Sequence, residues 1–161
     1  MTRYAENTVV SVEKSRMEIE RLLQRYGCDD FVYRSTMAMA QIGFRMPRRP
    51  RGALAGRMVR FDLELPERED FRMTSGRRPR ARDDAATFKA WEQGCRQRWR
   101  ALALVIKAKL EAVETGITSF EVEFMAHMVV PGGKVFHEVA LPQIAVAYET
   151  GRLPPLLGSG S

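Results

Sequence analysis

The chain has 161 residues, of which 45% are hydrophobic, enough for one domain with a buried core. No window approaches the roughly 20 apolar residues that a membrane-spanning helix needs, and the first residues lack the apolar stretch of a secretory signal. The two cysteines, Cys28 and Cys95, are too few for a disulfide scaffold or an all-cysteine zinc site. We therefore expect a reduced, cytoplasmic protein with no membrane contact.

The net charge of +6 is unevenly distributed along the chain. Residues 45–109 contain 15 Arg and 3 Lys against 8 Asp and Glu, a local balance of +10. The rest of the chain contains 8 basic and 12 acidic residues, a balance of −4. The basic charge is therefore concentrated in the middle of the chain, and most of it is arginine.

The N-terminal part predicts a disordered tail over residues 1–8 and then an amphipathic helix. Val9, Val10 and Val12 would allow a short strand before this helix. The helix begins after Ser11 or Ser15, and Ser15 would form a capping box with Glu18. Gly27 is suited to end the helix. Apolar residues follow the i, i+3, i+4, i+7 spacing of a helix with one buried face: Ile19, Leu22, Leu23 and Tyr26.

Three β-strands are predicted next, over residues 31–36, 40–46 and 58–65. The third alternates most clearly, with apolar residues at every second position from Val59 to Leu65 and Arg60, Asp62 and Glu64 between them. This alternation indicates an antiparallel meander with one buried and one solvated face. The connections 47–56 and 75–82 are rich in Arg, and we expect both to project into solvent.

A long helix is predicted from Asp83 or Asp84 to Gly116. Its apolar residues recur at spacings of three and four: Phe88, Trp91, Cys95, Trp99, Leu102, Ile106, Leu110 and Val113. At a rise of 1.5 Å per residue this helix would be about 45 Å long and would extend beyond a three-stranded sheet. The overhanging part would allow a homodimer through the long helix.

Residues 117–157 predict a helix–hairpin–helix addition, and residues 158–161 resemble a linker. Thr118 and Glu121 would cap a short helix through Met125. The hairpin would pair residues 128–130 with 134–139. The last helix would begin at Pro142, stop at Gly151, and turn three residues inward: Ile144, Ala145 and Tyr148.

The predicted fold class is α+β: a helix, a three-stranded antiparallel meander and a long helix over residues 9–116, followed by the addition. The helix–three strands–helix order is shared with double-stranded RNA-binding domains and some DNA-binding domains. The long helix and long loops do not match the compact double-stranded RNA-binding domain. Shared order is an analogy of topology, so function must be argued from side chains.

Motifs for common enzyme chemistry are absent from the sequence. It contains no phosphate-binding loop, no Gly-x-Gly-x-x-Gly after a strand and no Gly-x-Ser-x-Gly. His127 and His137, with Glu123 or Glu138, would allow a metal site, but no His-x-His or His-Glu-x-x-His spacing supports it. Two half-exposed histidines on facing strands are the favoured interpretation.

Three further groups have a catalytic or binding alternative and a structural one. Cys28 with His127 would allow a nucleophile–base pair, although small buried hydrophobes explain Cys28 and Cys95 better. Asp62 and Glu64 would suit a metal nuclease, or an ion pair with Arg60 on a solvated face. The tryptophans Trp91 and Trp99 would stack on bases or, as favoured, pack in the core. We therefore expect no enzymatic activity, no catalytic residue, no metal and no cofactor.

The arginines are the remaining candidates for function. The planar guanidinium can bind two phosphate oxygens at once, and a basic helix beside Arg/Pro loops can follow a nucleic-acid backbone. We expect DNA or RNA binding of low sequence specificity. An acidic surface of a host protein is the alternative partner. The candidate contacts are Arg48, Arg49, Arg51, Arg77, Arg78, Arg80 and Arg82 in the loops and Arg96 and Arg100 on the helix.

Residues 12–27, 91–117 and 141–151 together resemble a group of small uncharacterised bacteriophage and prophage proteins. The resemblance extends over most of the chain and contains no functional motif. It implies a phage protein in a bacterial cytoplasm. Two roles follow as expectations: an accessory of phage DNA metabolism, or an inhibitor of a host defence system.

Overall fold

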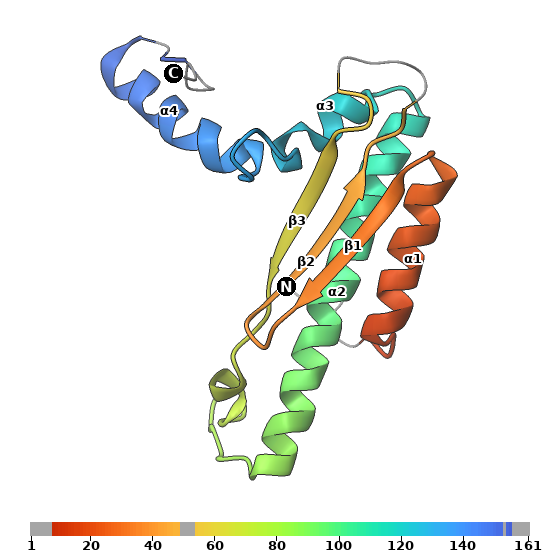
Figure 1. The fold of residues 1–161 in the computed structure, drawn as a ribbon. Coiled ribbons are helices and arrows are strands. Elements are labelled where there is room, and N and C mark those ends of the chain that lie inside the picture. The colour runs from red at the N-terminus through yellow and green to blue at the C-terminus, as the bar shows by residue number, and fades with distance from the viewer. Residues whose placement is uncertain (1–7, 49–53, 153, 156–161) are drawn as a thin grey trace.

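A helix, three strands and a long helix form the body of the protein, which confirms the predicted α+β class (Figure 1). The computed structural model describes residues 8–48, 54–152 and 154–155. The elements, in chain order, are α1 (Val12–Arg25), β1 (Asp29–Ser35), β2 (Met39–Arg45), β3 (Met58–Glu64), the 3₁₀ turn η1 (Arg68–Phe71), α2 (Asp84–Glu114), α3 (Phe120–Phe124), the 3₁₀ turn η2 (Met125–His127) and α4 (Phe136–Thr150).

The sheet is an antiparallel meander in the order β1-β2-β3, and its strand bounds lie within two residues of the predicted ones. Ile42 pairs with Tyr33 on one side and with Phe61 on the other. Helices α1 and α2 run side by side over one face of this sheet (Figure 1). The alternate apolar residues of the strands face the helices, and the core contains Ile19, Leu23, Ile42, Phe44, Val59, Phe61, Trp99, Leu102, Ile106, Leu110 and Phe124.

Helix α1 begins at the earlier of the two predicted caps. The Ser11 hydroxyl accepts a hydrogen bond from the Lys14 amide at 3.2 Å, which satisfies a free donor of the first turn. Ser15 therefore lies inside the helix, where it is buried. No strand precedes α1 in the described residues, and Val9 is 95% exposed. Gly27 follows the helix with φ +81°, the left-handed conformation expected of a stop residue.

The two edges of the sheet are irregular. On β1 the pairing register shifts between Asp29 and Val32, and Asp30 adopts a positive φ of 58°. Arg45 of β2 forms ion pairs with the carboxylates of both Asp29 and Asp30. Beyond β3, the Val129 amide donates to the Met58 carbonyl at 2.8 Å, so a short segment pairs with this edge.

Helix α2 extends well past the sheet, as predicted, and its first half is covered by the chain that follows β3 (Figure 1). The Trp91 indole N–H donates to the Pro66 carbonyl at 2.8 Å. Phe71 packs so closely on Gly94 that a Cβ there would lie 2.6 Å from the Phe71 Cζ atom. Residues 66–73 of the same chain therefore cover the side of the overhang that contains Trp91 and Gly94, whereas Phe88 remains 44% exposed.

The predicted hairpin after α3 is present but much shorter than expected. Val129 and Val135 form a single bridge, and the Val130 amide donates to the Lys134 carbonyl at 2.9 Å. The predicted second strand ends at Val135 because the Glu138 carboxylate accepts a hydrogen bond from the Val135 amide at 2.9 Å and caps a helix. The last helix thus begins at Phe136, and the predicted start at Pro142 is wrong, because Pro142 lies inside α4.

Helix α4 projects from the body of the protein (Figure 1). The prediction that Ile144, Ala145 and Tyr148 turn inward is wrong, since all three are exposed and Tyr148 is 88% exposed. Among the described residues of α4, Ala140 is the one that is buried. Within the described ranges, no helix combines the length and the apolar character needed to cross a bilayer.

Candidate nucleic-acid interface

The predicted arginines lie at opposite ends of the body. The Nε atom of Arg48 lies 3.9 Å from the Oδ2 atom of Asp29. This pair is close to the C-terminal end of α2, where the Tyr26 hydroxyl donates a hydrogen bond to Glu114. The stretch 75–82 leads directly into the first turn of α2. Because α2 has 31 residues, its two ends are about 46 Å apart. The two loops therefore do not form one patch, and Arg49 and Arg51 lie outside the described residues.

Residues 72–82, here called the arginine turn, form an ordered ribbon and do not extend freely as predicted. The Thr74 amide donates to the Arg80 carbonyl and the Arg82 amide to the Arg72 carbonyl, each at 2.8 Å. Met73 and Ala81 form an antiparallel bridge between these two bonds. The backbone of the turn is thus held by a short β-ladder.

Arg82 stabilises this turn from within. Its Nη1 atom donates to the carbonyl oxygens of Phe71 at 3.0 Å and Met73 at 2.6 Å. These two bonds use both hydrogens of Nη1 and fix the guanidinium at the base of the turn, where the residue is half-buried. The prediction that Arg82 is a mobile contact is therefore corrected: the residue holds the turn in shape.

The other three arginines of the turn, Arg77, Arg78 and Arg80, are exposed at its tip. Within the described part of the chain their side chains form no ion pair or hydrogen bond. The acids at this end are engaged elsewhere: Asp83 caps α2, Asp70 bonds the Glu67 amide, Glu69 pairs with Arg72, and Asp84 pairs with Arg68. Three guanidinium groups therefore remain available on a turn whose base is held by hydrogen bonds.

Arg96 and Arg100, predicted as fixed contacts on the helix, link α2 to the N-terminal part of the chain. Arg96 donates to the Gln93 side chain at 2.9 and 2.7 Å, and Gln93 in turn donates to the Thr8 carbonyl. Arg100 forms an ion pair with Glu18 of α1. Both guanidinium groups have structural partners, so neither remains in our proposed interface.

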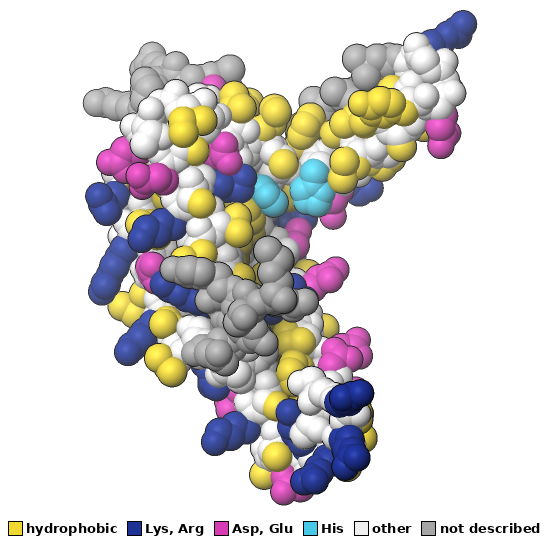
Figure 2. All heavy atoms as spheres, turned by 180° about the vertical axis from the view of Figure 1, so that it is seen from behind, with side chains coloured by type: hydrophobic (Ala, Val, Ile, Leu, Met, Phe, Trp, Pro, Cys, Tyr) yellow, Lys and Arg dark blue, Asp and Glu magenta, His cyan; other side chains and the backbone are white. Residues whose placement is uncertain are grey.

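A second set of basic side chains was not singled out from the sequence. Lys14, Arg21 and Arg25, here called the α1 basic row, are exposed and form no ion pair with a described residue. Their spacings of seven and four residues place them on one helix face. This spacing is the signal in the sequence that could have revealed the α1 basic row. The acidic residues of the same segment cancel its charge in a net count, so the charge distribution did not indicate it. Figure 2 shows Lys and Arg side chains along the side of the molecule formed by α1.

The histidines form an aromatic cluster. The His127 ring stacks on Phe61 with centroids 3.9 Å apart, and His137 lies edge-on to it at 5.7 Å. Burial, with Lys109 and His137 nearby, lowers the pKa of His127 to about 4. Among the described residues, no group of three or more His, Cys, Asp or Glu could hold a metal ion. A packing role fits His127 better than a metal-binding one.

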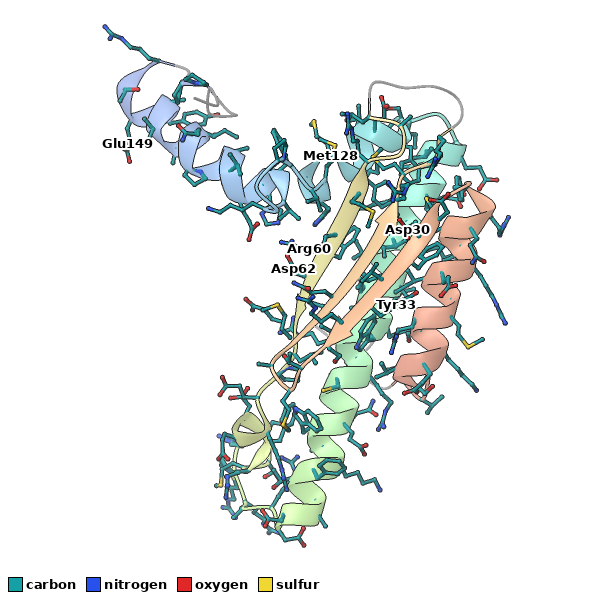
Figure 3. The ribbon with its side chains drawn as sticks, in the orientation of Figure 1. Asp30, Tyr33, Arg60, Asp62, Met128 and Glu149 are labelled. Atoms are coloured by element: carbon teal, nitrogen blue, oxygen red, sulfur yellow. The ribbon has the colours of Figure 1, made fainter. Side chains whose placement is uncertain are left out.

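The remaining candidates also have structural environments. Burial raises the pKa of the Cys28 thiol to about 12, which disfavours the nucleophilic thiolate. Asp62 lies beside Arg60 on the open face of the sheet, with an Oδ2–Nε distance of 3.0 Å, and it accepts a hydrogen bond from Gln41 (Figure 3). Trp99 is buried, and Trp91 is held by its bond to Pro66.

Comparison with known proteins gave no significant match to a protein-family model, a curated protein or a solved structure. The resemblance to phage proteins therefore stays a prediction from the sequence. Any argument about function has to rest on the side chains of this chain.

Proposed function

We propose that this protein binds nucleic acid through the backbone phosphates, with no enzymatic step. The observation that carries the proposal is the ordered arginine turn, which presents Arg77, Arg78 and Arg80 to solvent without a partner among the described residues. The phage context and the role in phage DNA metabolism rest on the sequence resemblance alone.

An arginine turn held by hydrogen bonds at its base suits phosphate recognition for two reasons. Each guanidinium offers a planar pair of donors that matches two phosphate oxygens. A backbone held by the Thr74 and Arg82 hydrogen bonds loses little conformational entropy when it binds. Phosphate contacts position a protein on the backbone but carry no sequence information, so we expect low sequence specificity.

The α1 basic row supplies a second contact region of the same sign. Lys14, Arg21 and Arg25 share one face of α1, and Glu18 beside them is neutralised by Arg100. We expect the turn to contribute more affinity than the row, because arginine binds phosphate oxygens in a bidentate manner and Lys14 cannot.

The test is fluorescence anisotropy with labelled single-stranded and duplex DNA and RNA at several salt concentrations. The variant replaces Arg77, Arg78 and Arg80 by Ala. The logarithm of affinity should fall with the logarithm of salt by about 0.9 per phosphate contact on duplex DNA, so loss of three contacts should reduce the slope by about 2–3.

A matched control removes the same charge from elsewhere on the surface: Arg34, Lys107 and Lys134 replaced by Ala, all exposed in the structure. Equal loss of affinity in both triple variants would show that net charge alone determines binding, and the assigned site would be wrong. Absence of binding to every nucleic acid at low salt would reject the function. Binding to polyglutamate instead would favour the alternative, an inhibitor that docks on an acidic protein surface.

A further inference from the structure

Helix α4 carries an apolar row on its solvent-facing surface. The row consists of Leu141, Ile144, Ala145 and Tyr148, at positions i, i+3, i+4 and i+7, and the exposed fraction is 60% for Leu141 and 88% for Tyr148. This spacing is that of a helix face buried in a core. Figure 2 shows the hydrophobic side chains gathered along the projecting helix. The sequence pattern is thus typical of a buried face, and the single chain leaves it exposed.

The body holds α4 through its first turn. Glu138 bonds the Val135 amide and lies 3.7 Å from the Arg60 guanidinium, and His137 contacts His127. From Leu141 onward, the hydrogen bonds among the described residues stay within the helix and the turn that ends it. A helix of 15 residues, about 22 Å long, is marginal in water without packing on its apolar face. A partner on the row would therefore stabilise it.

The chemistry of α4 argues against a lipid or nucleic-acid partner. Helices that lie on membranes carry Lys and Arg beside their apolar face. Between Phe136 and Thr150 there is no Lys or Arg, and the charged residues are Glu138 and Glu149. These carboxylates would be repelled by anionic lipid and by phosphates. The row therefore indicates a protein surface.

We propose that the row is the contact between two copies of this chain, packed antiparallel about a twofold axis between Ile144 and Ala145. In this arrangement Leu141 meets Tyr148 of the second copy, and Ile144 meets its Ala145. Each large residue thus faces a complementary one, and the small Ala145 lets the helix axes approach to about 8–10 Å. The row is self-complementary, as a twofold interface requires.

The charges of α4 favour the same antiparallel arrangement. Glu138 at the start of the helix comes close to Arg152 of the second copy, just beyond the other end. Antiparallel packing also opposes the two helix dipoles, whereas parallel packing would align them. Because the contact between two such short helices is small, we expect a reversible dimer that dissociates on dilution.

The test is sedimentation velocity of the full chain over a wide range of concentrations. The variant is Ile144→Glu, at the proposed axis. The matched control is Val146→Glu, which makes a similar change at an exposed position of the same helix but outside the row. We expect the unchanged protein and the control to dimerise and Ile144→Glu to stay monomeric, with circular dichroism showing that all three are folded.

Cysteine cross-linking fixes the orientation of the two helices. Cys28 and Cys95 are buried, so an introduced cysteine is the exposed thiol. Ile144→Cys should cross-link between copies, whereas Tyr148→Cys should not, because antiparallel packing places the two copies of residue 148 on opposite sides of the axis and parallel packing would bring them together. A monomer at all concentrations, with the row covered instead by residues 153–157, would overturn the proposal. Disruption by Val146→Glu equal to that by Ile144→Glu, or cross-linking through Tyr148→Cys, would overturn it as well.

Discussion

Replacing Gly94 by Ala tests whether residues 66–73 pack on the overhanging half of α2. In an exposed helix this change stabilises by about 1 kcal/mol, because alanine has the higher helix propensity. In this structure the new Cβ would lie 2.6 Å from the Phe71 Cζ atom and 3.1 Å from the Pro66 Cγ atom. Overpacking of this kind costs about 1–3 kcal/mol. We therefore expect a net loss of about 1 kcal/mol, the difference between these two effects.

The assay is urea and thermal unfolding followed by circular dichroism, where a loss of this size lowers Tm by about 2–4 °C. Ala101→Gly, at an exposed position of the same helix, measures the propensity term alone and should cost about 1 kcal/mol. In a Phe71→Ala background the clash is relieved, so Gly94→Ala should become neutral or stabilising. Stabilisation of the unchanged protein by Gly94→Ala would refute the packing of Phe71 on α2.

Three other predictions concern the stability of the body. Tyr26→Phe removes a hydrogen bond of 2.7 Å to Glu114 and should cost about 1 kcal/mol in urea unfolding; no loss would contradict the bond. His127 has a folded pKa of about 4 against an ordinary 6.5, so stability should fall as pH drops between these values, and His127→Gln should flatten that dependence. A double-mutant cycle on Glu18 and Arg100 should give a coupling below about 1 kcal/mol that shrinks with salt, because the pair is partly exposed.

Most of the body could be predicted from the sequence because its signals are local. The alternation around Phe61, the caps of α1 and α2, and the three-and-four spacing through Trp99 each determine an element within a few residues. The start of α4 could not be predicted in this way. Val135, Phe136 and Val139 follow a Pro-Gly-Gly turn and favour a strand, and the Glu138 bond to the Val135 amide starts a helix there instead.

The candidate site was less predictable, because identical arginines have different environments. Nothing local distinguishes Arg80 from Arg82, yet Arg82 bonds two carbonyls of the preceding chain and Arg80 does not. Likewise, the partner of Arg100 is Glu18, 82 residues away in the sequence. Phe71 packs on α2 because the chain turns back toward this helix after β3. Residues 66–73 have no helix or strand periodicity from which this turn could be predicted.

The irregular edges of the sheet bear on how the protein behaves at high concentration. A flat, unpaired edge strand is a template on which another chain can add a strand. On β1 the register shift and the left-handed Asp30 bend the edge, and its carboxylates would be buried by an incoming strand. On β3 the segment at Met128 and Val129 already occupies part of the edge. Association by strand addition is thus disfavoured at both edges, which leaves helical contacts as the route to ordered assembly.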